Sequence, residues 1–402
     1  MITTQEADKI ILTNVEPVMT ELCPLAKSSG RILRENIFLD RDQPPFDKAL
    51  MDGIAIDIAS WLKGNRGFNI EGIQPAGKRE VYLKDKNACI EIMTGAVLPH
   101  GTNAIIPVED IKVENQVAFV SSDIVKRYQN IRFKGSDAKK DHQVLKSGCQ
   151  LLPPCVAIIA STGKPKVKVS HMPNIAIIST GDELIAVGKT MLPSQTRISN
   201  AYALKAIFEQ TQFLKAATFH IKDDKKQLLK KIEHMLNKFD CLVLSGGVSM
   251  GKFDYIPHIM QALNVKLLFH KVRQKPGKPF WFGKTKNKKP IFALPGNPVS
   301  TQICAYRYVL PYFKKNVGLK SLGQTYALFE RHVKNRSGLT YFCPVRVVSE
   351  DKGKRVVRPI AYNGSGDFAS LAQAHGFVEL NEYKKVFRQD DPVPFYGWRF
   401  EG

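Results

Sequence analysis

An alternation of strand-like and helix-like segments restricts the fold of this chain more than any other feature. Short apolar runs, among them IAIIS (175–179) and CLVLS (241–245), alternate with helical patterns near 200–212 and 224–238. Strands that alternate with helices of this length form a parallel sheet with helices on both faces. The sequence therefore predicts an open, mostly parallel α/β sheet domain, which we place at residues 169–318.

Two other regions have the pattern of β structure. Residues 44–139 contain short runs such as GIAIDI and ACIEIM, separated by turn residues, which predict an all-β insertion domain. Short alternating strands return near the end of the chain and predict a small β-barrel domain at residues 319–402.

The segments on either side of the insertion have helical patterns. Thr3 and Glu6 have capping-box spacing, and apolar residues at near-helical intervals predict an amphipathic helix over residues 3–23. A helical pattern resumes after the insertion. We predict a discontinuous, helical N-terminal linker domain made of residues 1–43 and 140–168.

The formal net charge of +22 would attract a polyanionic partner. No RNP-like aromatic motif, helix-turn-helix signature or Cys/His finger accompanies this charge, so we predict no binding to nucleic acid. The densest basic run, Lys284–Lys289, stands between two apolar strands and looks like a solvated hairpin tip. The excess charge is therefore interpreted as a general basic surface.

Cysteine usage and hydropathy indicate the compartment. The seven cysteines form no CxxC pair, which favours reduced thiols over a disulfide framework or a zinc site. The chain contains no apolar run of about 18 residues, and acids lie among its first residues in place of a basic and then apolar leader. We expect a cytoplasmic protein that neither spans a membrane nor is exported.

Three loops follow predicted strands of the α/β domain and read STGDEL, SGGVSMG and PGNPVS. In an open α/β sheet, ligands lie beyond the carboxyl ends of the strands, so these loops should face one crevice. Small residues at a strand end expose backbone N–H groups that can bind phosphate-like anions. The predicted anion-binding residues are Ser245, Gly246, Gly247, Ser249, Pro295, Gly296 and Asn297.

A basic loop follows in the sequence FHKVRQKPGKPFWFG. It places Lys271, Lys275 and Lys278 close together, with Pro276-Gly277 interrupting any regular element. A flexible ammonium group is a good point charge for a phosphate or a tetrahedral oxyanion. We therefore predict that these lysines bind an anion.

Acidic residues at loop positions are candidates for a hard cation. Magnesium binds through one or two carboxylates together with waters and substrate phosphates, so an acid beside a phosphate loop fits this role. The same acids are also common turn formers and helix caps, and both interpretations stay open at this point. The sequence has no HExxH motif, nucleophile elbow or P-loop, which excludes metalloprotease, α/β-hydrolase and P-loop classes.

Seven motifs, taken in order, carry a resemblance to a known family. They are PPFDKALMDGIAI, IEIMTGAVLPHGTNAIIPVED, IAIISTGDEL, RISN, VLSGGVSMGKFDY, KPGKPFWFG and ALPGNPVS, and together they span most of the chain. In these motifs the chain resembles the molybdopterin molybdenumtransferase family, which includes the bacterial MoeA proteins and the E-domain of gephyrin.

The resemblance implies an activity and an assembly. Members of this family insert molybdate into adenylylated molybdopterin with loss of AMP, in the presence of Mg2+. They are dimers of four-domain subunits, and each active site lies between the α/β domain of one subunit and the β insertion of the other. A homodimer is therefore expected here, with molybdopterin adenylyltransferase and molybdoenzyme acceptors as further partners.

The resemblance also implies residue roles. The implied catalytic residues are Asp52, Thr94, Glu183, Asp254, Lys271 and Lys275. The implied metal ligands are Asp137, Glu183, Asp223 and Asp254. Lys278 and Ser365, the latter from the C-terminal domain, would join the anion-binding residues above. The chain departs from the family at Cys343-Pro344, where an arginine is usual, and Arg346 is the candidate substitute.

Two alternative functions come from other classes of protein. The first is a molybdopterin-binding scaffold without turnover, because gephyrin shows that the architecture can organise other proteins. The second is a molybdopterin adenylyltransferase, whose α/β domain carries a similar SGGVS loop. The length of the chain argues against the second, and the combined set of acids and lysines favours catalysis.

Overall fold

The computed structural model describes residues 1–247, 255–320, 323–361 and 363–398. Contacts divide the chain into two compact units. The first, here the large unit, comprises residues 1–35, 147–156 and 165–402, and the second, the insertion unit, comprises residues 36–146 and 157–164. The four domain ranges given above stay a prediction.

A six-stranded sheet forms the centre of the large unit, in the order β16-β13-β17-β21-β20-β18. Its first four strands are parallel, and β20 and β18 are each antiparallel to their neighbour. The bounds are β13 Asn174–Thr180, β16 Lys215–Ile221, β17 Cys241–Ser245, β18 Lys266–His270, β20 Trp281–Lys284 and β21 Pro290–Leu294. The predicted α/β sheet is thus confirmed, with an antiparallel pair at one edge.

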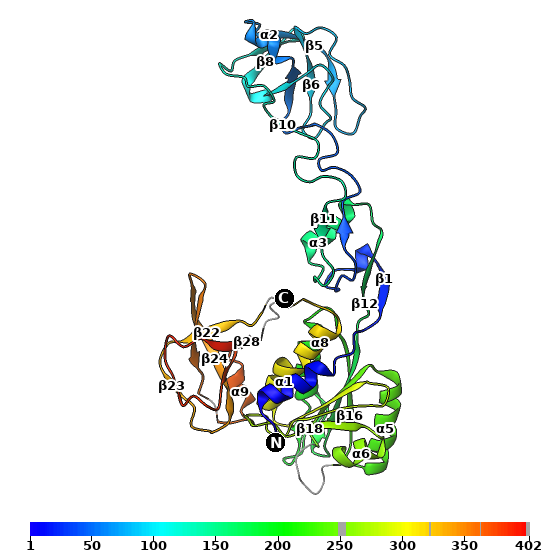
Figure 1. The fold of residues 1–402 in the computed structure, drawn as a ribbon, viewed down its shortest axis with the longest axis vertical. Helices are drawn as coiled ribbons and strands as arrows, with labels where there is room; N and C mark the ends of the chain where they lie inside the picture. Colours follow the sequence, from blue (N-terminus) through cyan, green and yellow to red (C-terminus); the bar gives the residue numbers. More distant parts are fainter. Residues whose placement is uncertain (248–254, 321–322, 362, 399–402) are drawn as a thin grey trace. The chain divides into compact units, whose positions relative to one another are not determined.

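Helices cover both faces of this sheet, whose central strands β13, β17 and β21 are buried on both sides. Ile175 and Ile177 pack towards one core, with helices α4 (Asn200–Glu209), α7 (Pro298–Cys304) and α8 (Leu310–Asn316). Ala176 and Ile178 pack towards the other, with α5 (Lys225–Lys238) and α6 (Ile256–Ala262), which lie side by side in Figure 1.

The helical segment that follows β21 is interrupted. A π-helical turn, Ala305–Val309, separates α7 from α8. Pro311 has no N–H and cannot donate to the carbonyl of Arg307, four residues earlier, which explains why the regular ladder fails at this place. The turn contains Arg307 and Tyr308, both of which are buried.

Five strands near the C-terminus close into a barrel, as predicted. β24 pairs with both β25 and β26, and the ring continues through β22 and β28. The bounds are β22 Tyr326–Phe329, β24 Thr340–Asp351, β25 Lys354–Pro359, β26 Gly376–Leu380 and β28 Val393–Gly397. A short helix, α9 (Phe368–Leu371), lies between β25 and β26, and strands β23 (Val333–Lys334) and β27 (Val386–Phe387) pair outside the ring.

The insertion unit contains a second six-stranded sheet, in the order β7-β4-β6-β5-β9-β8. The bounds are β4 Gly53–Ile56, β5 Gly67–Gln74, β6 Ala88–Ile92, β7 Ala104–Pro107, β8 Ile111–Glu114 and β9 Val117–Val120. Short pairs of strands, β3 (Lys48–Ala49) with β10 (Ile131–Arg132) and β2 (Ile37–Phe38) with β11 (Gln143–Leu145), complete it. One helix, α2 (Ile58–Leu62), is added to the predicted β structure.

The predicted N-terminal helix is correct at its start and wrong at its end. The capping box between Thr3 and Glu6 is present, but α1 spans only Thr4–Thr13, and β1 (Thr20–Pro24) follows. Pro17 prevents the helix from continuing, and β1 pairs with β12 (Lys166–Ser170). In Figure 1, α1 lies beside α8, and its buried residues join the α/β core.

Two lysines of the predicted solvated hairpin tip, Lys284 and Lys289, instead bind backbone carbonyls of other segments. The run does join the antiparallel strands β20 and β21, but Lys284 is buried and its Nζ donates to the carbonyl of Asn14. Lys289 Nζ donates to the carbonyls of Leu236 and Phe239. Free backbone carbonyls nearby, which the sequence pattern does not reveal, attract these ammonium groups.

Two further expectations concern cysteines and membranes. All seven cysteines are free thiols, and α3 (Pro153–Ser161) carries one of them. Within the described residues, no helix combines the length and apolarity required to cross a bilayer.

Candidate active site

The predicted loops and the basic loop lie at one edge of the central sheet. Parallel strands β13, β17 and β21 end there, at Thr180, Ser245 and Leu294. Because β20 is antiparallel to β21, its first residue, Trp281, pairs with Ala293 near the same edge, and His270 at the end of β18 pairs with Trp281. The basic loop between β18 and β20 is therefore held beside the strand ends.

A pocket of about 460 Å³ lies at this edge and brings together six of the predicted residues. They are Lys275, Lys278, Pro295, Gly296, Asn297 and Ser365. The side chains of Lys275 and Lys278 are exposed, and neither forms an ion pair with any of the residues described. Two uncompensated ammonium groups beside a small pocket favour a dianion as its ligand.

The barrel contributes directly to this pocket through Ser365. Asn297 Nδ2 donates to Ser365 Oγ at 2.7 Å, and the N–H of Val299 donates to the carbonyl of Ser365 at 3.2 Å. The basic loop has its own contact with the barrel, because β19 (Gln274–Lys275) pairs with Thr340–Tyr341 of β24. The barrel thus fixes both sides of the pocket.

Asn200 hydrogen-bonds to two of the loops. The sequence analysis predicts no role for this residue. Its Nδ2 donates to Ser245 Oγ at 2.8 Å and to the carbonyl of Gly296 at 2.7 Å. Since a carbonyl can only accept, these contacts fix the orientation of the amide. The only sequence signal was its place in RISN, at the first residue of α4.

The two glycines after β17 matter mainly because they lack a side chain, and less as N–H donors to an anion. Gly246 and Gly247 have φ of +100° and +68°, and a Cβ on Gly247 would lie 3.0 Å from Thr180 Oγ1. The N–H of Gly246 already donates to the carbonyl of Leu294, at 3.3 Å. Small residues are thus required here, because Gly246 packs against the carbonyl of Thr180 and Gly247 against the side chains of Thr180 and Ile256.

Lys271 lies at the same edge but does not line the pocket. Its N–H donates to the carbonyl of Phe280 at 2.9 Å, and its carbonyl accepts the N–H of Ile2 at 3.2 Å. The side chain is half-buried. Its predicted catalytic role stays a proposal.

Two of the predicted metal ligands follow neighbouring strands. Glu183 comes after β13 and Asp223 after β16, and the last residues of these strands, Thr180 and Ile221, are paired. The N–H of Asp223 donates to Asp182 Oδ1 at 3.2 Å. No group of three or more His, Cys, Asp or Glu gathers as a metal site within the described parts of the chain. Asp254 and Ser249, also predicted, lie outside the described residues.

The remaining predicted acids belong to the insertion unit. Asp52 Oδ1 accepts hydrogen bonds from the N–H and the hydroxyl of Thr94. Asp137 Oδ1 accepts two hydrogen bonds from the guanidinium of Arg132, at 2.9 and 2.7 Å, which occupy one of its oxygens. The structure thus brings Asp52 and Thr94 together, and gives Asp137 a cationic partner.

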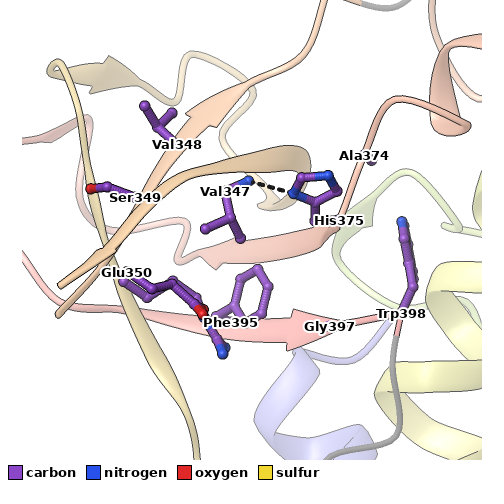
Figure 2. Close-up of a pocket in the computed structure, with 10 residues that line it drawn as sticks. Val347, Val348, Ser349, Glu350, Ala374, His375, Phe395, Gly397 and Trp398 are labelled. Carbon is purple, nitrogen blue, oxygen red and sulfur yellow. Dashed lines mark hydrogen bonds and ion pairs between the residues drawn. The ribbon is translucent and has the colours of Figure 1, made fainter. Parts of the chain in front are cut away.

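A larger pocket, of about 600 Å³, lies on the barrel and contains none of the predicted residues (Figure 2). Its charges compensate one another, because Arg355 forms an ion pair with Glu350 and lies 4.5 Å from the centre of the Phe395 ring. Figure 2 also shows His375, whose Nδ1 accepts the N–H of Val347 at 3.1 Å. Its compensated charges, and not its volume, distinguish this pocket from the smaller one that Lys275 and Lys278 line.

Three family profiles match successive parts of the chain. They are described as the MoeA N-terminal region (domain I and II) at residues 2–163, a probable molybdopterin binding domain at residues 176–315, and the MoeA C-terminal region (domain IV) at residues 326–398. The α/β sheet, the β insertion and the closed barrel therefore define a MoeA-like multidomain protein.

Individual relatives cover almost the whole chain. A molybdopterin molybdenumtransferase of Synechocystis is 35% identical over 92% of this chain and 93% of its own length. One of Haemophilus influenzae is 30% identical over 95% of each chain. A crystal structure of a molybdopterin biosynthesis MoeA protein from Pyrococcus horikoshii, 27% identical, covers 100% of both chains with a TM-score of 0.80. The chain belongs to the molybdopterin molybdenumtransferase family, whose members are transferases of molybdenum cofactor biosynthesis.

Proposed function

We propose that this protein inserts molybdate into adenylylated molybdopterin and releases AMP. The observation that carries the proposal is the small pocket with two uncompensated lysines, Lys275 and Lys278, beside the Pro295–Asn297 loop. Molybdate is a tetrahedral dianion, and ammonium groups with nearby hydroxyls suit its charge and its oxygens.

The reactants repel each other in water, since adenylylated molybdopterin is itself an anion. Lysines at the sheet edge lower this repulsion and hold both reactants close together, which converts an encounter in solution into a reaction within one site. Ser365 and Asn297, which hydrogen-bond each other, would orient oxygens of the bound anion. Release of AMP is then coupled to binding of molybdate.

Glu183 and Asp223 fit a magnesium site of low protein coordination. They lie in loops that follow paired strands, and magnesium needs only one or two carboxylates when phosphate oxygens and water complete its shell. Asp254 would be a third ligand. A magnesium ion held there would neutralise pyrophosphate charge.

The resemblance supports a homodimer in the cytoplasm whose active site combines two subunits. In that arrangement Asp52, Thr94 and Asp137 of one subunit serve the α/β pocket of the other. The seven free thiols support the cytoplasm as the compartment.

The test is to incubate the purified protein with adenylylated molybdopterin, magnesium and molybdate, and to follow AMP. Release that depends on molybdate supports the enzyme. Retention of the nucleotide under every condition would instead support a molybdopterin-binding scaffold.

A further inference from the structure

A buried glutamine lies beneath the basic loop. Gln274 directly precedes Lys275 and is 1% exposed. Its Oε1 accepts a hydrogen bond from the hydroxyl of Tyr308, and its Nε2 donates to the carbonyl of Gly277 at 3.0 Å. Nε2 also lies 3.4 Å from Cys304 Sγ. The polar atoms of Gln274 therefore contact the protein, although the residue borders the anion pocket.

This network has one hydrogen-bonding arrangement. The carbonyl of Gly277 can only accept, so Nε2 must face it, and Tyr308 must then donate to Oε1. Burial raises the pKa of Tyr308 and raises the pKa of Cys304 to about 12, so both groups keep their protons at neutral pH. The contacts that hold the amide are thus unchanged across the physiological range.

The loop packs directly against this amide. Gly277 has φ of +93°, and a Cβ there would lie 2.7 Å from Gln274 Nε2 and 2.9 Å from Cys304 Sγ. On the other side, the N–H of Val272 donates to the carbonyl of Lys278 at 3.0 Å. The backbone of the turn is therefore fixed at both ends, while the side chains of Lys275 and Lys278 are exposed.

The position of Tyr308 depends on the π-helical turn at Ala305–Val309. A π-helical turn adds a residue to the helical repeat and so changes the direction in which the following side chains point. Tyr308 is 1% exposed, and its ring lies against Phe280, 5.0 Å between centroids, at the end of the basic loop. Its hydroxyl is thus brought to Gln274 by a local irregularity of the helix.

We propose that Gln274 and Tyr308 position Lys275 and Lys278, and that they thereby set both the affinity for the tetrahedral dianion and the preference for molybdate over the smaller sulfate. This inference rests on the proposed function. A single lysine discriminates poorly between anions of different size, because its side chain is flexible and its ammonium group acts as a point charge. Because the backbone of the loop is fixed, the positions that the two ammonium groups can reach are restricted. A dianion of one size therefore binds better than a smaller or larger one. Gln274 acts through the loop and is a positioning residue.

Three variants test this role: Gln274→Leu, Tyr308→Phe and the double variant. We expect Gln274→Leu to raise the molybdate KM for AMP release about 10- to 100-fold, with kcat at saturating molybdate little changed, because misplacement by about 1 Å has effects of this size. Inhibition by sulfate should strengthen relative to molybdate binding. Each single change leaves a buried polar group without its partner and lowers Tm.

The double variant separates positioning from stability. Removal of both partners should restore part of the lost Tm, but the molybdate KM should stay high because the carbonyl of Gly277 still lacks its amide. Tyr312→Phe is a matched control, since Tyr312 is equally buried in the same core and bonds the backbone of Glu16 instead. It should lower Tm and leave the molybdate KM unchanged.

The proposal would be overturned if Gln274→Leu kept the wild-type molybdate KM and the wild-type preference for molybdate over sulfate. It would also be overturned if the molybdate KM of the double variant returned towards the wild-type value together with its Tm. Absence of molybdate-dependent AMP release from the wild-type protein would contradict the proposed function instead. In that case, calorimetric titration of wild-type protein and Gln274→Leu with molybdate decides the inference, which requires weaker binding by the variant and is contradicted by equal binding.

Discussion

Thr94 donates two hydrogen bonds, from its backbone N–H and from its hydroxyl, to one carboxylate oxygen of Asp52, at 2.6 and 2.8 Å. These bonds, the backbone one first, lower the pKa of Asp52 below its ordinary value. The carboxylate is therefore ionised at every pH above its ordinary range, and none of the described residues hydrogen-bonds to its second oxygen. Asp52 directly precedes β4, and its carbonyl accepts the N–H of Val108 at 3.0 Å.

Asp52→Asn should abolish AMP release while the protein stays folded. Asn keeps an acceptor for Thr94 but removes the charge, and loss of a charged group that acts on the reacting atoms lowers rates by about 100-fold or more. AMP release and thermal unfolding are measured together. Asp47→Asn is the control, because Asp47 accepts the N–H of Lys134 at 2.8 Å and holds a turn. If Asp52→Asn and Asp47→Asn released AMP at the same rate, Asp52 would have no catalytic role.

Gly277→Ala should be more destabilising than the same change at Gly353. Both glycines have positive φ, +93° and +76°, but nothing lies within 4 Å of a Cβ at Gly353. The backbone penalty of about 1–2 kcal/mol is shared, whereas the collision with Gln274 and Cys304 adds about 1–3 kcal/mol only at Gly277. Urea unfolding of the two variants gives the difference. Equal losses of stability would show that the loop can move away from the amide.

The ion pair between Asp8 and Arg307 should make stability depend on pH. Arg307 binds both carboxylate oxygens of Asp8, each at 2.6 Å, yet burial raises the pKa of Asp8 above its ordinary value. The folded protein then binds a proton that the unfolded chain has lost. This contribution is complete below about pH 4 and is lost as the pH rises through the folded pKa.

Comparison with Asp8→Asn isolates this effect. The free energy of unfolding of the wild-type protein, relative to the variant, should fall as the pH rises above about 4. Asp367→Asn is the control of opposite sign, because the N–H of Asn363 lowers the pKa of Asp367. Its contribution is lost only when the pH falls through that lowered pKa. A constant difference between wild type and Asp8→Asn across pH 4–7 would contradict the raised pKa.

A site shared between subunits predicts complementation. Asp52→Asn and Lys275→Gln should each be defective under limiting molybdate. When the two are refolded together in equal amounts, half of the dimers combine one of each, and one of the two sites in such a dimer is intact. About one quarter of the wild-type rate should return. No recovery, with mixed dimers demonstrated by tags on the two chains, would place each site within one subunit.

The sequence predicted the strands of the central sheet because IAIIS and CLVLS are apolar on both faces and end in small residues. The closed barrel and the β insertion were predicted from short alternating runs. The N-terminal helix was predicted too long, since the periodic pattern continues past Asn14 and Pro17, where the helix ends. The local sequence pattern thus predicts which strands and helices are present more reliably than it predicts where they end.

The side chains of Asn200 and Gln274 could not be assigned roles from sequence, because their partners are far away in the chain. Asn200 meets Gly296, and Gln274 meets Tyr308, only after the sheet and the helices have packed. The hydrogen bonds of Lys284 and Lys289 to distant backbone carbonyls have the same origin. Lys275, Asn297 and Ser365 were predicted from motifs, and the structure places all three around one pocket.

The molybdate dependence of AMP release, compared between the wild-type protein and Lys275→Gln, tests the central claim most directly. Lys286→Gln is the control, because Lys286 is exposed at the hairpin tip. We expect saturable, molybdate-dependent release by the wild type and the control, and a molybdate KM raised about 10-fold or more in Lys275→Gln, since one charge-assisted contact contributes about 1.5–3 kcal/mol. A molybdate requirement identical in all three proteins would contradict the assignment of this pocket as the molybdate site.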